Sequence, residues 1–241
     1  MSGSRPIVIV HMLSSVDGRL DVSRYSKPYN DVDNKNGSSY FTIAEEYHPD
    51  GILLGSNSFL ESIPSPSFDH SKFSPPATFD DYVGKMESKH LTAIFDSKGR
   101  IEYQSNDAFG DNIIAVLGES VSSEYLSHLR AKGISYIFAG KDGRNYQLAL
   151  EKLYSLFGMK KVLLEGGGVL NGAFLKQRMI DELSIIIASS IDGLSGISSI
   201  FEYKGEKGEK PSEGQFLELI ETKVIPEEKS SVLLRYKVHK E

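Results

Sequence analysis

The stretch that decides the fold runs from Lys160 to Ala188 and reads KKVLLEGGGVLNGAFLKQRMIDELSIIIA. It contains a short apolar run, Val162 to Leu164, which is followed by Glu165 and by three consecutive glycines. In the segment from Val169 to Gln177, apolar residues recur at positions i, i+3 and i+4, which is the spacing of one helix face. The stretch therefore predicts a strand, a glycine turn and a helix, in that order.

The three glycines, Gly166, Gly167 and Gly168, have two interpretations. Glycine reaches positive φ at little cost, so they can simply form a tight turn. Alternatively, they leave the backbone N–H groups at the helix start open to a ligand, and a helix start favours an anion such as a phosphate. Glu165 lies at the carboxyl end of the predicted strand, where open α/β sheets place ligand groups. This position favours a binding role, but both interpretations stay open.

The composition is that of a globular protein without cysteine chemistry. Of the 241 residues, 39% are hydrophobic, which is enough to form a substantial core. Because cysteine is absent, disulfides, thiolate catalysis and cysteine-based zinc sites are excluded. The six histidines are scattered without an HxH or HxxxH pair, so no metal site is expected.

Charge and hydropathy argue against two classes of partner, nucleic acids and membranes. The net charge is −6 and the lysines form no basic stripe, which argues against nucleic acid as a main partner. No apolar run approaches the roughly 18 residues that a membrane span requires. The N-terminus shows no signal-peptide pattern. We therefore expect a cytoplasmic protein that binds small molecules and no membrane.

The whole chain alternates predicted strands and helices. Strands are expected at residues 7–12, 51–55, 91–95, 113–117, 134–138 and 181–188, and helices at 40–47, 122–131 and 145–157. Two alternating segments, 216–224 and 231–239, predict a C-terminal antiparallel hairpin. The expected fold is α/β, with a mixed, mostly parallel sheet, helices on both faces and one domain over residues 1–241. The polar loop at 21–39 is unusually long, which suggests that it covers a site or binds a ligand.

Polar residues near the end of the first predicted strand are candidate ligand groups. Ser14, Ser15 and Asp17 follow this strand directly, and His11 interrupts its apolar run. The alternative for Asp17 is an ordinary loop tip, since an Asp-Gly pair is itself a turn signal. For His11 the alternative is a structural histidine.

Two further strand ends carry polar side chains. The run GSNS at 55–58 looks like a second junction of strand and helix, where hydroxyl and amide groups either contact a ligand or cap the helix. The run DSKGR at 96–100 offers a hydroxyl and two cations, as a nucleotide phosphate requires, or forms an ordinary surface turn.

Together these motifs resemble the reductase domain family of riboflavin biosynthesis, which has the dihydrofolate-reductase-like fold. The matching pieces occur in the family's order over nearly the whole chain: Arg5-Pro6, SVDGR at 15–19, GSNS at 55–58, FDS at 95–97 with Arg100, EGGGVLN at 165–171 and IDEL at 180–183. The resemblance implies an NADPH-dependent reduction of 5-amino-6-(5-phosphoribosylamino)uracil by a homodimer.

The resemblance also implies roles for individual residues, with no metal. The catalytic side would include Asp17 and Glu165. Substrate contacts would come from His11, Ser14, Ser15 and Asn171. Cofactor contacts would come from Gly55, Ser56, Asn57, Ser58, Ser97, Arg100, Gly166, Gly167, Gly168, Val169 and Leu170, with Ser97 or Arg100 sensing the 2′-phosphate.

Two departures from the family pattern keep the substrate open. His11 stands where the family usually has a lysine, and the segment SIPSPSFDHSKF at 62–73 offers only Lys72 where the family has a phosphate-binding arginine. A phosphate without arginine loses a bidentate partner. One alternative is therefore a reductase of another heterocycle or carbonyl compound, and another is a nucleotide-binding relative without catalysis. The preference for NADPH over NADH also stays open.

Overall fold

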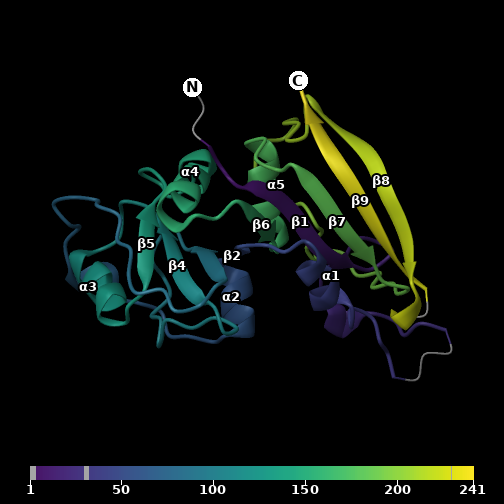
Figure 1. Ribbon diagram of the computed structural model, residues 1–241, viewed down its shortest axis with the longest axis horizontal. Helices are drawn as coiled ribbons and strands as arrows, with labels where there is room; N and C mark the ends of the chain where they lie inside the picture. The colour runs from purple at the N-terminus through teal and green to yellow at the C-terminus, as the bar shows by residue number, and fades with distance from the viewer. Residues whose placement is uncertain (1–3, 30–32, 229) are drawn as a thin grey trace. The chain divides into compact units, whose positions relative to one another are not determined.

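The computed structural model describes residues 4–29, 33–228 and 230–241 (Figure 1). Its contacts divide the chain into two compact units, one formed by residues 1–6 and 50–162 and the other by residues 7–49 and 163–241. The expectation of a single domain over residues 1–241 stays a prediction. In the described part of the chain, no helix is long and apolar enough to cross a membrane.

The first unit is built on a parallel sheet with the strand order β5-β4-β3-β2. Its elements are β2 (Gly51–Gly55), α2 (Ser56–Ser62), a 3-10 turn (His70–Lys72), β3 (Leu91–Phe95), β4 (Asn112–Leu117), α3 (Ser123–Ala131), β5 (Ser135–Phe138) and α4 (Tyr146–Phe157). All five residues of β3 are buried, as the continuous apolar run predicts for a central parallel strand.

Local signals define the helices of the first unit. The side chains of Ser122 and Asn145 accept hydrogen bonds from the first turns of α3 and α4, and both helices were expected at these positions. Gly158 ends α4 in the left-handed conformation (φ 70°), which glycine adopts without strain. At α2 the capping alternative for the run at 55–58 is wrong. The N-cap is Gly55, and no side chain caps this helix.

The second unit combines a parallel strand pair with the C-terminal hairpin, in the order β1-β7-β9-β8. Its elements are β1 (Ile7–Ser14), a 3-10 turn (Val22–Arg24), α1 (Tyr40–Glu46), α5 (Gly168–Lys176), β7 (Glu182–Ile187), β8 (Gln215–Ile225), a 3-10 turn (Pro226–Glu228) and β9 (Ser231–Lys240). β1 and β7 are parallel, whereas β9 pairs antiparallel with both β7 and β8. β6 (Lys161–Leu164) starts in the first unit and ends in the second.

The predicted strand, glycine turn and helix are confirmed as β6, residues 165–167 and α5. The helix begins at Gly168, so the third glycine belongs to its first turn rather than to the preceding loop. β1 extends two residues beyond the predicted end and includes Ser14. The α/β class, the mostly parallel strands and the antiparallel hairpin are likewise confirmed. Of the long loop at 21–39, residues 30–32 lie outside the described residues.

Candidate functional site

The glycine turn leaves the start of α5 available to an anion. Gly167 is the N-cap, and no side chain caps the helix. An α-helix provides no internal partner for its first N–H groups, which here belong to Gly168, Val169 and Leu170. The dipole of the helix adds positive potential at the same place. Val169 is 45% exposed, whereas Leu170 is buried. The backbone of this turn can therefore bind a phosphate.

Backbone conformation and close packing also explain why two of the three positions are glycine. Gly166 has φ +85°, and a Cβ on it would lie 3.3 Å from atoms of Met12. A Cβ on Gly168 would lie only 2.2 Å from the carbonyl oxygen of Ser199. The backbone N–H of Glu202 donates to the carbonyl oxygen of Gly168 (2.8 Å), so the segment at 199–203 packs directly on the helix start. A tight turn and close packing explain these two glycines without a ligand, and their cofactor role stays a prediction.

Asn171, a residue of α5, is buried against the segment at 199–203. Its side chain is fully buried, and its Nδ2 donates to the carbonyl oxygen of Ile200 (2.9 Å). Among the described residues, its Oδ1 has no hydrogen-bond partner. This geometry supports a structural role in holding the segment at 199–203, and substrate contact stays a prediction.

At the end of β1, Ser15 and Asp17 form a hydrogen-bonded turn. Ser15 Oγ donates to Asp17 Oδ1 (2.6 Å), and the same carboxylate accepts from the backbone N–H groups of Asp192 (3.1 Å) and Gly193 (2.9 Å). These bonds, the one from Ser15 first, hold the pKa of Asp17 well below its usual range. Asp17 is therefore ionised at neutral pH and anchors the segment around 192. Its predicted catalytic role is untested, but such a carboxylate is a poor proton donor.

His11 and Tyr40 join β1 to α1. His11 is fully buried, with Nε2 3.0 Å from the carbonyl oxygen of Tyr40 and Nδ1 2.9 Å from Ser184 Oγ. Because a carbonyl only accepts, Nε2 carries the ring proton and Nδ1 accepts from the serine. Burial lowers the pKa of His11 to about 4, so the ring is neutral at neutral pH. Tyr40 in turn donates its hydroxyl to the carbonyl oxygen of His11 (2.9 Å).

Glu165 belongs to the same neighbourhood. Burial and, secondly, the charge of Glu165 raise the pKa of Tyr40 well above its usual value, which places this carboxylate near the phenol. Glu165 itself is half-buried. A carboxylate at the edge of a buried polar cluster is a suitable candidate for managing a proton.

An apolar hollow of about 360 Å³ opens beside this cluster. Its lining residues are Met12, Leu13, Leu20, Val22, Asn36, Gly37, Tyr40 and Phe41. Phe41 is 73% exposed, which is unusual for so large an apolar side chain and typical of a binding surface. The sequence reasoning missed Met12, Tyr40 and Phe41 because Met12 is far from the other two in the chain. The long polar loop was the only signal, and it does contribute to the lining.

In the first unit, the structure brings two separately predicted motifs together. Arg100 Nη2 donates to Ser56 Oγ (2.6 Å) and to Asn57 Oδ1 (2.8 Å). Its Nε lies 3.8 Å from Asp96 Oδ1, and Asp96 is almost fully buried. The polar side chains of Ser56 and Asn57 therefore orient an arginine that stays about half exposed (47%). This guanidinium can donate hydrogen bonds to a phosphate.

Two further candidate cofactor residues of this unit, Ser58 and Ser97, accept hydrogen bonds at their backbone carbonyl oxygens. Ser58 offers its backbone carbonyl to Ser62 Oγ (3.2 Å). Ser97 is half-buried and accepts at its carbonyl oxygen from the N–H of Gly118 (2.9 Å). Among the described residues, no group of three histidine, aspartate or glutamate side chains could hold a metal ion.

Comparisons with known proteins agree on one family. The family model of the RibD C-terminal domain matches residues 6–225. A 2,5-diamino-6-ribosylamino-4(3H)-pyrimidinone 5′-phosphate reductase from Aquifex aeolicus is 24% identical over 204 residues, which cover 84% of this chain and 85% of the relative. The reductase of the same name from Methanothermobacter thermautotrophicus is 25% identical, with 78% and 80% covered.

A solved structure shows the same fold. The pyrimidine reductase-like protein from Corynebacterium diphtheriae superimposes with a TM-score of 0.66 and 16% identity. The match covers 98% of this chain and 93% of that protein. At this identity the likeness concerns the fold alone.

Proposed function

This chain belongs to the RibD C-terminal domain family, and from this premise we propose that it is a reductase of 2,5-diamino-6-ribosylamino-4(3H)-pyrimidinone 5′-phosphate. The observation that carries the proposal is a family match over residues 6–225, which includes every candidate site residue. Two relatives with more than three quarters of their length covered bear the name of this activity. These names favour the diamino compound over the uracil that the sequence resemblance implied.

We propose NADPH as the cofactor, which would supply the hydride. Two parts of the chain fit its phosphates. In the second unit, the first-turn N–H groups of α5 form an anion site. In the first unit, Arg100 is oriented by Ser56 and Asn57 and can form a charge-assisted pair with the 2′-phosphate.

The substrate site proposed here is the hollow beside β1. Met12, Tyr40 and Phe41 offer apolar and aromatic surface to a planar heterocycle. Glu165, near Tyr40, is the group we propose for holding or delivering a proton. The neutral His11 would keep Tyr40 and the start of α1 in place rather than carry charge to the substrate.

One observation favours a second candidate, a reductase of a heterocycle without a phosphate. Lys72, which replaces the expected arginine, has a 75% exposed side chain and lies 3.6 Å from Asp69. A lysine so exposed and already paired is a weak phosphate ligand. Comparing the phosphorylated substrate with its dephosphorylated form decides between the two candidates. A strong preference for the phosphate supports the first, and equal turnover supports the second.

Placing a negative charge at the N-cap of α5 should weaken cofactor binding. We expect Gly167→Asp to weaken NADPH binding at least about tenfold, because its carboxylate repels a phosphate at the helix start. Aspartate is a preferred N-cap residue, so the helix itself should persist. Fluorescence titration with NADPH and with NADH measures the effect.

Gly167→Asn is the matched control, since it adds a side chain of the same size without charge and caps equally well. It should bind NADPH within about threefold of the original protein.

In the same titrations, Arg100→Gln should weaken the binding of NADPH more than that of NADH, since only NADPH carries the 2′-phosphate. If neither nucleotide binds the unmodified protein, the reductase proposal fails.

We further propose a homodimer formed through one face of the C-terminal hairpin. Paired residues of antiparallel strands point to the same side of the sheet. This rule places the following residues on one face: Ile185 and Ile187 of β7, Val232, Leu234 and Tyr236 of β9, and Leu217, Leu219, Thr222 and Val224 of β8. The three apolar members on β8 are 54–60% exposed, and the set contains no charged residue. The opposite face carries the ion pairs of Arg235 with Glu221 and Glu182.

A charge on the apolar face should separate the dimer. We expect Leu219→Glu to convert the protein to a monomer, because a buried, unpaired carboxylate opposes association. Lys223→Glu places the same side chain on the opposite face of β8 and should leave the dimer intact. Sedimentation or light scattering gives the mass. A monomeric original protein, or a Leu219→Glu dimer, would refute the proposed interface.

A further inference from the structure

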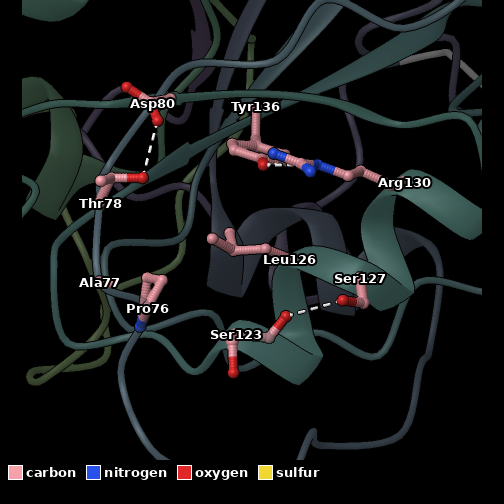
Figure 2. A pocket seen from close by; sticks show the side chains of 9 residues that line it. All are labelled: Pro76, Ala77, Thr78, Asp80, Ser123, Leu126, Ser127, Arg130 and Tyr136. Atoms are coloured by element: carbon pink, nitrogen blue, oxygen red, sulfur yellow. Dashed lines mark hydrogen bonds between the residues drawn. The ribbon is translucent and has the colours of Figure 1, made fainter.

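The first unit contains a second pocket, of about 230 Å³, that none of the candidate cofactor residues lines. Its lining comes from the segment at 76–80, from α3 and from β5: Pro76, Ala77, Thr78, Asp80, Ser123, Leu126, Ser127, Arg130 and Tyr136. Figure 2 shows Leu126 between the two walls, with Arg130 and Asp80 at the rim. The pocket thus has an apolar floor and charged groups of both signs.

Arg130 is held in position by two aromatic rings. Its guanidinium carbon lies 5.2 Å from the ring centre of Tyr82 and 5.6 Å from that of Tyr136. Its Nε donates to the hydroxyl of Tyr136 (2.9 Å). The described residues offer no acceptor to either Nη atom, so the outer edge of the guanidinium is available. A planar guanidinium with both Nη groups available matches a carboxylate in two-point geometry.

The pocket wall formed by the segment at 76–80 is anchored to the rest of the unit at several points. Tyr82 and Tyr136 exchange two backbone hydrogen bonds of 2.9 Å each. Beside Asp80, the side chain of Asp81 accepts from the N–H of Phe138 and from Lys152 Nζ, both at 2.9 Å. At the other end of the wall, the carbonyl oxygen of Ser74 accepts from the N–H of Ser123 (3.1 Å). The pocket is therefore formed by the fold rather than by a loose surface loop.

Asp80 supplies the second charge. Its Oδ2 accepts from Thr78 Oγ1 (2.7 Å), an interaction that Figure 2 shows. Although Arg130 and Asp80 line the same pocket, no ion pair within 4.0 Å joins them in the described structure. Two opposite charges that face one cavity without neutralising each other match a ligand that carries both charges.

We propose that this pocket binds a small zwitterion of the amino-acid class, with its carboxylate on Arg130 and its ammonium group towards Asp80. Its carbon side chain would lie on Leu126, Pro76 and Ala77. A phosphate dianion fits less well, because it would meet one cation and the like charge of Asp80. A simple carboxylic acid would leave the charge of Asp80 uncompensated. For a ligand of this size, a Kd of about 0.1–1 mM is expected.

The test is a titration of the isotope-labelled full chain with each standard amino acid, followed by the backbone amide signals of residues 77–80 and 123–130. At least one amino acid should shift these signals in a saturable way. Arg130→Gln should weaken that binding at least about tenfold. Arg144→Gln, an exposed arginine of the same unit outside the pocket, is the matched control and should leave the binding unchanged.

A second variant tests the role of Asp80. In the original protein, replacing the amino group of the ligand by hydroxyl should weaken binding several-fold, because the ion pair with Asp80 is lost. In Asp80→Asn the amino acid and the corresponding 2-hydroxy acid should bind about equally. The amide spectrum of each variant reports whether the fold is retained. The proposal is overturned if no amino acid shifts the pocket signals, or if Arg130→Gln binds as the original protein does.

Discussion

Gly172→Ala is expected to lower the free energy of unfolding by about 3 kcal/mol, which corresponds to a loss of about 6–12 °C in Tm. A Cβ at this position would lie 2.4 Å from the backbone nitrogen of Tyr203 and 2.8 Å from its Cα. Backbone atoms cannot rotate away as a side chain does, so either α5 or the segment at 199–203 must move. The higher helix propensity of alanine offsets only about 1 kcal/mol of this cost.

Val169→Ala provides the matched control for this substitution. It places the same residue on the same helix, but at a site that is 45% exposed, so stability should change by less than about 0.5 kcal/mol. Thermal and denaturant unfolding of both variants measure the difference. A Gly172→Ala protein as stable as the original would show that the segment at 199–203 does not pack on α5 as described.

The second large effect concerns pH and His11. Its pKa is about 4 in the folded protein, because of burial, and about 6.5 in the unfolded chain. As the pH falls from about 6.5 to 4, the unfolded chain binds a proton that the folded protein does not. Stability should therefore decrease across this window, by about 3 kcal/mol in total, and His11 should contribute no further loss below pH 4.

His11→Gln tests this expectation, since glutamine retains a donor for the carbonyl oxygen of Tyr40 but does not titrate. Its stability should decrease clearly less between pH 6.5 and 4 than that of the original protein, although it should be lower than that of the original protein at neutral pH. His90→Gln, at an exposed histidine, should keep the original pH dependence. Denaturant unfolding at several pH values gives the slope of the free energy of unfolding against pH for each protein. Equal slopes for His11→Gln and the original protein would rule out this role for His11.

Most elements of the fold were predictable from local pattern. The apolar runs that became β2, β3 and β6 and the caps at Ser122, Asn145 and Gly158 depend on neighbours within a few residues. The alternating tail likewise formed the hairpin of β8 and β9. Element ends were less predictable, since a strand such as β1 extends as far as its neighbour β7 pairs with it.

The candidate site was predictable in its parts but not in its contacts. Sequence analysis selected Ser56, Asn57 and Arg100 separately, and the structure joins them through two hydrogen bonds. For Ser56 and Asn57 it left two alternatives open, a ligand contact or a cap of α2, and the capping alternative is wrong because their side chains contact an arginine more than forty positions away. A side chain with several partners in reach chooses among them only in the folded state.

The sequence by itself determined the order and type of the elements, the glycine turn before α5 and the family resemblance, because each depends on residue types at short spacings. Only the tertiary structure decided that Gly168 and Gly172 face the segment at 199–203, that His11 is a neutral link to Tyr40, and that an apolar hollow and a pocket with two charges exist. The physical reason is the same in each case. Close packing, burial and unpaired charge depend on residues that are distant in the chain and meet only when it folds.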